Sequence, residues 1–87
     1  MALLGGGGGP IMRHMSDIVE QIGLTVNGEP MQAAAGITLA GLIGRLELDT
    51  RKVAVERNLE IVPRSAYATT VLEAGDRLEI VHFIGGG

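Results

Sequence analysis

A single stretch of this chain has clear helical periodicity, and stretches of period two lie on both sides of it. The apolar residues of the helical stretch recur at i, i+3, i+4 and i+7 and share one face: Leu39, Leu42, Ile43 and Leu46. Thr38 is the expected N-cap, and the helix should end near Glu47. Because one face of this helix is apolar, it must pack against a layer of strands.

A hairpin is predicted before the helix. Apolar residues alternate with polar or small ones over residues 22–26, which is the period of a half-buried strand. Asn27-Gly28 follows at once, and this dipeptide is the strongest short-range signal for a type I′ turn. A weaker returning strand is expected over residues 31–35, where Gly36 breaks it.

Shorter elements should follow the helix. In chain order we expect a strand at 53–56, an extended piece at 60–62, a helical turn at 64–67, a short strand at 70–72 and a final strand at 78–84. Since the final strand comes after a helix crossover and an inserted pair, it should lie in the middle of a mixed sheet. The predicted fold class is therefore α+β, a ubiquitin-like β-grasp with one main helix on one face of the sheet.

Composition excludes several classes of function. The chain has 87 residues and no Cys, so it forms one domain without disulfides, thiolate metal sites or a cysteine nucleophile. Seven basic residues against ten acidic ones give a net charge of −3, and a nucleic-acid partner is not expected. No apolar run approaches the roughly 20 residues that span a bilayer, and no secretory signal opens the chain. We therefore expect a cytoplasmic protein with no membrane contact and no metal site.

Three segments are expected along the chain. Residues 1–15 include five consecutive glycines before Pro10, and we interpret them as a flexible N-terminal extension, either a tag or a misplaced start. Residues 16–84 should form the β-grasp domain. Residues 85–87 should form a flexible glycine tail.

Three stretches carry a resemblance to a known family: LTVNG at 24–28, VAVERN at 53–58 and GDRLEIVHFIGGG at 75–87. Over residues 22–87 the chain resembles the ubiquitin-like sulfur carriers, most closely the thiamin-biosynthesis sulfur-carrier family. The resemblance implies activation by an ATP-dependent adenylyltransferase, sulfur supplied through a cysteine desulfurase, and delivery to thiazole synthase. It also implies a protein cosubstrate rather than an enzyme, with no catalytic residue and no bound cofactor, since the partner consumes the ATP.

The glycine tail has chemistry that agrees with this resemblance. A carboxylate is a poor electrophile, but its mixed anhydride with AMP can be attacked by a sulfur nucleophile inside a narrow slot of a partner. Gly87 would then be adenylated and converted to a thiocarboxylate, while Gly85 and Gly86 serve as a flexible tether. Three extended residues reach about 10 Å beyond the last strand.

A docking surface is predicted next to the tail. If Leu78, Ile80 and Ile84 face the helix, then Val81 and Phe83 point away from it, because strand side chains alternate. Exposed apolar residues beside a reactive end suit a partner surface. In the opposite register, Phe83 would belong to the core.

The remaining polar residues near the tail are not assigned to the site. His82 is expected to make a packing or partner contact, and Arg57 and Arg64 are expected to be solvated. Asp76 and Glu79 are carboxylates without a second acid–base group to complete a catalytic site.

Three alternatives to a thiamin sulfur carrier remain open on these residues. The small subunit of molybdopterin synthase shares the fold and the diglycine end, although that family tends to place prolines before it. A ubiquitin-like modifier would use the same carboxylate chemistry, and here Lys52 is the only lysine for self-linkage. A β-grasp binding module with an accidental tail would be unaffected by loss of Gly86 and Gly87.

Overall fold

The computed structural model describes residues 20–83. The β-strands are β2 (Gln21–Val26), β3 (Glu29–Ala34), β4 (Val53–Arg57), β5 (Glu60–Val62) and β6 (Arg77–His82). The α-helix is α2 (Leu39–Arg45), and two 3₁₀ turns are η1 (Thr50–Lys52) and η2 (Arg64–Ala66). The predicted extension at 1–15 and the tail at 85–87 lie outside the described residues, so the predicted domain boundaries stay predictions.

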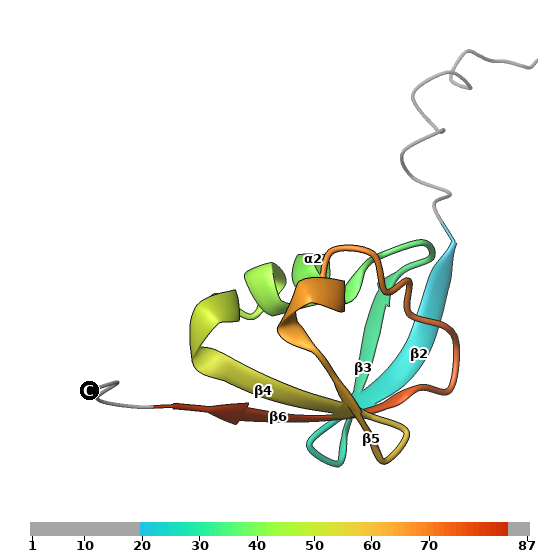
Figure 1. The fold of residues 1–87 in the computed structure, drawn as a ribbon. Coiled ribbons are helices and arrows are strands. Elements are labelled where there is room, and N and C mark those ends of the chain that lie inside the picture. The colour runs from blue at the N-terminus through green and yellow to red at the C-terminus, as the bar shows by residue number, and fades with distance from the viewer. Residues whose placement is uncertain (1–19, 84–87) are drawn as a thin grey trace, which may run out of the picture.

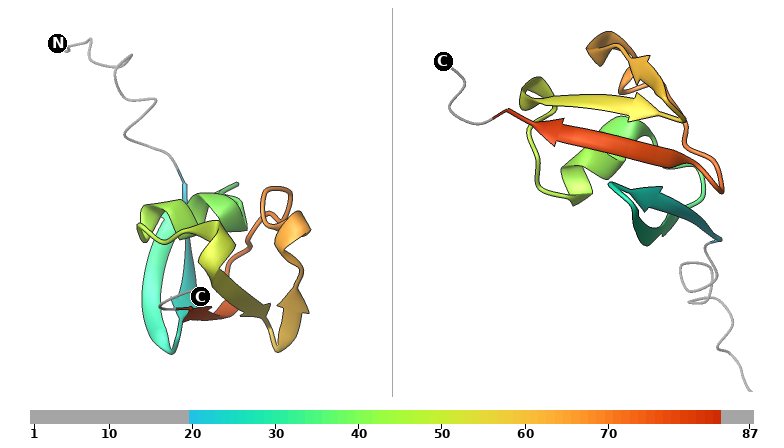
Figure 2. Two further views of the ribbon diagram at one scale, coloured as in Figure 1. Left: turned by 60° about the vertical axis from the view of Figure 1, so that its left-hand side comes forward. Right: turned by 90° about the horizontal axis from the view of Figure 1, so that it is seen from below.

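The five strands form one mixed sheet in the order β3-β2-β6-β4-β5. The last strand, β6, lies at the centre, parallel to β2 and antiparallel to β4. Figure 2 shows β6 between its two neighbours, and Figure 1 shows α2 lying across one face of the sheet. The predicted α+β fold with a central final strand is therefore confirmed.

The first hairpin has the predicted turn. Asn27 and Gly28 both adopt positive φ angles, 52° and 83°, as a type I′ turn requires. Strand β3 begins directly after it, with Glu29 opposite Val26, and ends at Ala34. The returning strand is thus 29–34 rather than 31–35, because the tight turn starts pairing immediately.

Helix α2 begins where predicted and ends early. The Thr38 side chain accepts a hydrogen bond from the Gly41 amide at 3.0 Å, which confirms the N-cap. The helix stops at Arg45 because Glu47 turns to a φ of 61° and donates its amide to the Gly44 carbonyl. Leu46, predicted on the buried face, is half-buried at this end.

The core fills the space between α2 and the sheet. Its largest fully buried side chains are Leu39, Leu42, Ile43, Val53, Val55, Leu72 and Leu78. The predicted strand at 70–72 is wrong: only an isolated bridge joins Val71 to Thr38. Leu72 is nevertheless buried, so its apolar character reflects the core and not a strand.

Candidate functional site

The end of β6 is held firmly up to the last described residue. His82 pairs with Val53 of β4, and the Phe83 amide donates to the Lys52 carbonyl at 2.7 Å. Lys52 belongs to η1, which Asp49 caps by accepting the Arg51 amide at 2.8 Å. These hydrogen bonds therefore fix the backbone at the end of β6.

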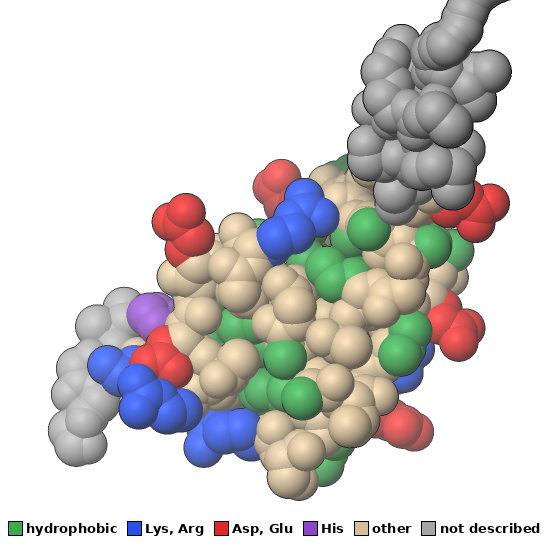
Figure 3. Space-filling view, turned by 90° about the horizontal axis from the view of Figure 1, so that it is seen from above, with side chains coloured by type: hydrophobic (Ala, Val, Ile, Leu, Met, Phe, Trp, Pro, Cys, Tyr) green, Lys and Arg blue, Asp and Glu red, His purple; other side chains and the backbone are tan. Residues whose placement is uncertain are grey.

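An exposed ion pair lies at the start of η1, the turn that holds the end of β6. The Asp49 carboxylate lies 2.9 Å from the Arg51 guanidinium. Hydrogen bonds from the Arg51 side chain and amide lower the pKa of Asp49 to about 2. Seen from the helix side, basic side chains gather near the end of β6, while hydrophobic side chains form small separate patches (Figure 3).

The predicted alternation along β6 is present in the structure. Leu78 and Ile80 are buried, whereas Val81 is 58% exposed and Phe83 is 46% exposed. Val81 therefore lies on the outer face of the sheet, which we define as the face opposite α2. Ile84 and the tail glycines Gly85, Gly86 and Gly87 lie outside the described residues, so the docking role of Val81 and Phe83 stays a prediction.

The outer face carries two apolar residues that sequence reasoning missed. Leu59 is 86% exposed in the β4–β5 turn, and Ile61 is 77% exposed on β5. Together with Ala54 and Val81 they line an open groove of about 470 Å³. Alternation along β4 places Glu56 on this face, and Ile61 is its cross-strand partner. The sequence does not show how β5 pairs with β4, and this register is what places Ile61 beside Glu56 on the outer face.

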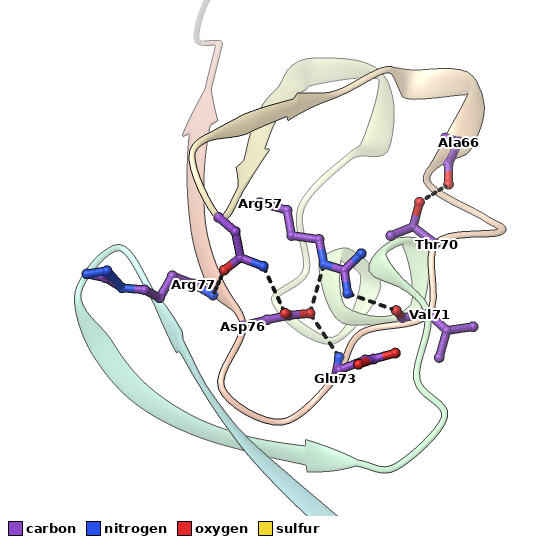
Figure 4. Close-up of polar contacts among 8 residues, drawn as sticks. Arg57, Ala66, Thr70, Val71, Glu73, Asp76 and Arg77 are labelled. Carbon is purple, nitrogen blue, oxygen red and sulfur yellow. Dashed lines mark hydrogen bonds and ion pairs between the residues drawn. The ribbon is translucent and has the colours of Figure 1, made fainter.

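Asp76 organises a polar cluster at the start of β6 (Figure 4). Its carboxylate is 5% exposed and accepts hydrogen bonds from Arg57 Nε at 2.8 Å, the Asn58 side chain at 3.0 Å and the Glu73 amide at 2.9 Å. Burial opposes ionisation, but these three donors outweigh it and hold the pKa of Asp76 below its ordinary value. The expectation of a solvated Arg57 is wrong, because its guanidinium is committed to Asp76.

Two features are absent from the described residues. Within 20–83 no group of three His, Cys, Asp or Glu side chains is arranged to hold a metal ion. No helix in this range is long and apolar enough to cross a membrane. His82 is exposed, as is Glu79 on the outer face, while Asp76 is engaged by three donors.

Comparison with known proteins agrees with this arrangement. Residues 24–87 match the model of the ThiS family. The sulfur carrier protein ThiS of Bacillus subtilis is 42% identical over 50 residues, which cover 58% of this chain and 76% of that protein. The crystal structure of a thiamine biosynthesis protein (ThiS) from Geobacter metallireducens superposes with a TM-score of 0.65 at 35% identity, covering 76% of this chain and all of that one.

A longer relative matches more strongly. A thiazole synthase of Paramagnetospirillum magneticum is 58% identical over 64 residues, or 74% of this chain. The match spans 20% of that protein, and about a fifth of a second thiazole synthase from Magnetococcus marinus. The family model covers most of the present chain, from the first hairpin to the last glycine. The chain therefore belongs to the ThiS family.

Proposed function

We propose that this chain is the sulfur carrier for thiazole formation in thiamin biosynthesis, with the carboxylate of Gly87 as the group that carries sulfur. The observation that supports the proposal most is the position of β6. The central strand of a ThiS-family sheet comes shortly before Gly85-Gly86-Gly87 in the sequence and is held at its end by the Phe83–Lys52 hydrogen bond. A rigid body with a short glycine tether suits delivery of one terminal group into a partner.

The proposed chemistry has two steps on the tail. A carboxylate oxygen of Gly87 attacks the α-phosphorus of ATP, and pyrophosphate leaves, so that an acyl adenylate forms. A hydrosulfide-equivalent nucleophile then attacks the carbonyl carbon, AMP leaves with one carboxylate oxygen, and a thiocarboxylate and a proton remain. Three glycines allow the acyl carbon to enter a narrow, water-poor slot because they present no side chains to its walls.

The partners follow from this scheme. We propose an adenylyltransferase for activation, a cysteine desulfurase pathway as the sulfur source, and thiazole synthase as the acceptor, all in the cytoplasm. Val81 and Phe83, the exposed apolar residues nearest the tail, would dock these partners. The chain would bind no cofactor and supply no catalytic side chain, since the adenylyltransferase binds the ATP.

The mass of the intact chain tests the proposal. The purified chain is incubated with Mg-ATP, the cognate adenylyltransferase and sulfide, and we expect the mass increase that replacement of one oxygen by sulfur produces. The matched control lacks Gly86 and Gly87; it should fold identically and show no mass change. An unchanged mass for the full chain, with an adenylyltransferase proven active on another carrier, would contradict the proposal.

A separate measurement identifies the protein that accepts the sulfur from the carrier. The match to the ThiS family favours thiazole synthase over the large subunit of molybdopterin synthase. The thiocarboxylated chain should lose its sulfur when thiazole synthase and its substrates are added, and keep it with the large subunit of molybdopterin synthase. The reverse result would assign the chain to the molybdopterin pathway.

A further inference from the structure

The last hydrogen bond described at the end of β6 is made to a turn and not to another strand. The β4–β6 ladder ends at His82, which pairs with Val53. One residue further along, the Phe83 amide donates to the carbonyl of Lys52 at 2.7 Å, and Lys52 belongs to η1. The position of the backbone at Phe83 therefore depends on how firmly η1 holds this carbonyl.

Hydrogen bonds hold η1 in place more than packing does, because none of its three residues is buried. The Asp49 carboxylate accepts the Arg51 amide at 2.8 Å, and the Asp49 carbonyl accepts the Lys52 amide at 2.8 Å. A side-chain acceptor at this position stabilises the start of a helical turn. Removing the carboxylate therefore leaves the Lys52 amide bond as the remaining hydrogen bond within the turn.

The ion pair that the same carboxylate makes adds little to global stability. Nη2 of Arg51 lies 2.9 Å from Oδ2 of Asp49, and the Arg51 side chain is 81% exposed. Pairs at such positions contribute little, because water screens the charges and both side chains lose freedom. What the Asp49 carboxylate mainly determines is the geometry of η1.

We propose that Asp49 is a positioning residue for the tail: its cap on η1 fixes the Lys52 carbonyl and thereby the backbone at Phe83. This inference rests on the proposed function, because it concerns how the terminal carboxylate reaches the adenylyltransferase. Only Ile84 lies between Phe83 and Gly85 in the sequence, so each residue released from the sheet lengthens a short tether. A longer tether lowers the fraction of docked complexes in which the reacting group is in place.

The kinetics of activation test the inference. The rate of ATP–pyrophosphate exchange by the cognate adenylyltransferase is measured against carrier concentration, which separates KM for the carrier from kcat. Asp49→Ala should lower kcat about threefold or more and leave KM nearly unchanged, because the folded body still docks. Its urea midpoint should stay near that of the wild type, since the ion pair is exposed. Glu29→Ala removes an exposed carboxylate of the first hairpin and should keep both constants.

Two further substitutions separate the cap from the ion pair. Asp49→Asn keeps a side-chain oxygen for the Arg51 amide and loses the charge, so it should restore most of kcat. Arg51→Ala removes the guanidinium and keeps the amide, so it should also retain kcat. If either variant loses as much kcat as Asp49→Ala, the charge and not the cap is responsible, and the inference is overturned.

Hydrogen exchange of the Phe83 amide provides a readout that does not need the partner. It is followed by NMR on the free chain at constant pH. Asp49→Ala should make this amide exchange about tenfold faster or more, because its acceptor is no longer held in place. The Ile80 amide, which Oδ1 of Asn27 accepts at 2.8 Å, is the internal control and should keep its wild-type rate. An unchanged rate at Phe83 would overturn the inference whatever the kinetics show.

The inference and the proposed function fail in different ways. If the wild-type chain supports exchange and Asp49→Ala keeps its kcat, or changes KM instead, the positioning role is overturned and the carrier function stands. If the wild-type chain supports no exchange with an adenylyltransferase proven active on another carrier, both are overturned.

A semisynthetic chain decides the question if Asp49→Ala lowers the urea midpoint substantially. An ester in place of the Phe83 amide removes only the hydrogen-bond donor and keeps the side chain. It should lower kcat by the same factor as Asp49→Ala, and the two changes combined should lower it no further. An ester variant with wild-type kcat would show that the Phe83–Lys52 bond does not position the tail.

Discussion

The side-chain amide of Asn27 pairs with the backbone of Ile80 as a strand residue would. Its Oδ1 accepts the Ile80 amide at 2.8 Å, and its Nδ2 donates to the Ile80 carbonyl at 3.2 Å. The regular parallel ladder between β2 and β6 ends at Val26 and Leu78. The Asn27 side chain extends this contact at the point where the backbone turns away toward β3. One residue therefore supplies both the type I′ turn and a connection to the central strand.

Asn27→Gly should separate these two roles. Glycine adopts the positive φ angle without strain, but it leaves the Ile80 amide and carbonyl without the side-chain partner. We expect the free energy of unfolding to fall by about 1–3 kcal/mol, measured by urea denaturation. A urea midpoint equal to that of the wild type would show that the Asn27 side chain matters only for the turn.

Asp76→Ala should destabilise the chain and change its response to acid. Removing the carboxylate leaves Arg57, Asn58 and the Glu73 amide without their acceptor, and we expect a loss of about 2 kcal/mol at pH 7. The folded-state pKa of Asp76 is lowered, so its stabilisation is complete above the unfolded pKa and disappears as pH falls through the folded one.

The measurement is the urea midpoint from pH 7 down to pH 2. The difference between wild type and Asp76→Ala should shrink below about pH 4, because Asp76 becomes protonated first in the unfolded chain and, at lower pH, in the folded chain as well. Glu29→Ala, an exposed carboxylate outside the cluster, serves as the control and should match the wild type throughout. A difference that stays constant with pH would contradict the charged state of Asp76.

Two glycines of α2 should respond differently to alanine. A Cβ at Gly44 meets no atom within 4 Å, so Gly44→Ala should raise the free energy of unfolding by about 1 kcal/mol through helix propensity. A Cβ at Gly41 would lie 3.2 Å from Cγ1 of Ile37 and 3.3 Å from Oγ1 of Thr38. Gly41→Ala should therefore raise the free energy of unfolding by less than Gly44→Ala does, or lower it. Equal thermal shifts for the two variants would argue against this crowding.

Val81→Ala/Phe83→Ala should impair activation more than folding. Both side chains are exposed, so truncation should change the free energy of unfolding by less than about 1 kcal/mol. Loss of apolar contact with the partner should raise KM for the carrier about tenfold in the exchange assay, with kcat retained. Val71→Ala removes another exposed valine, 49% exposed and outside the groove, and should leave KM unchanged. An equal increase in KM for Val71→Ala and for the double variant would show a general effect of lost apolar surface.

Much of the fold could be predicted because its signals are local. The Asn27-Gly28 turn, the Thr38 cap, the helix face of Leu39, Leu42 and Ile43, and the alternation along β6 each depend on neighbouring residues. Backbone stereochemistry and side-chain periodicity act at that range. The central position of β6 also followed from the order of elements, since a strand that returns after a crossover must pair inside the sheet.

Features that depend on residues far apart in the chain could not be predicted. Arg57 reaches Asp76 because the turn after β4 and the loop before β6 meet, and no local pattern carries that information. Residues 70–72 are apolar enough for a strand, yet a strand requires a free sheet edge, and they bridge only Thr38.

The groove on the outer face also depends on residues far apart in the chain. Alternation places Glu56 and Glu79 outward on their own strands, but only the β4–β6 register sets them opposite each other. Only the β5 register adds Ile61 beside them. Most of the elements and the glycine end could be predicted from the residues alone, because these features depend on local chemistry. Folding decided the surface that surrounds them, because register is a property of pairs of strands.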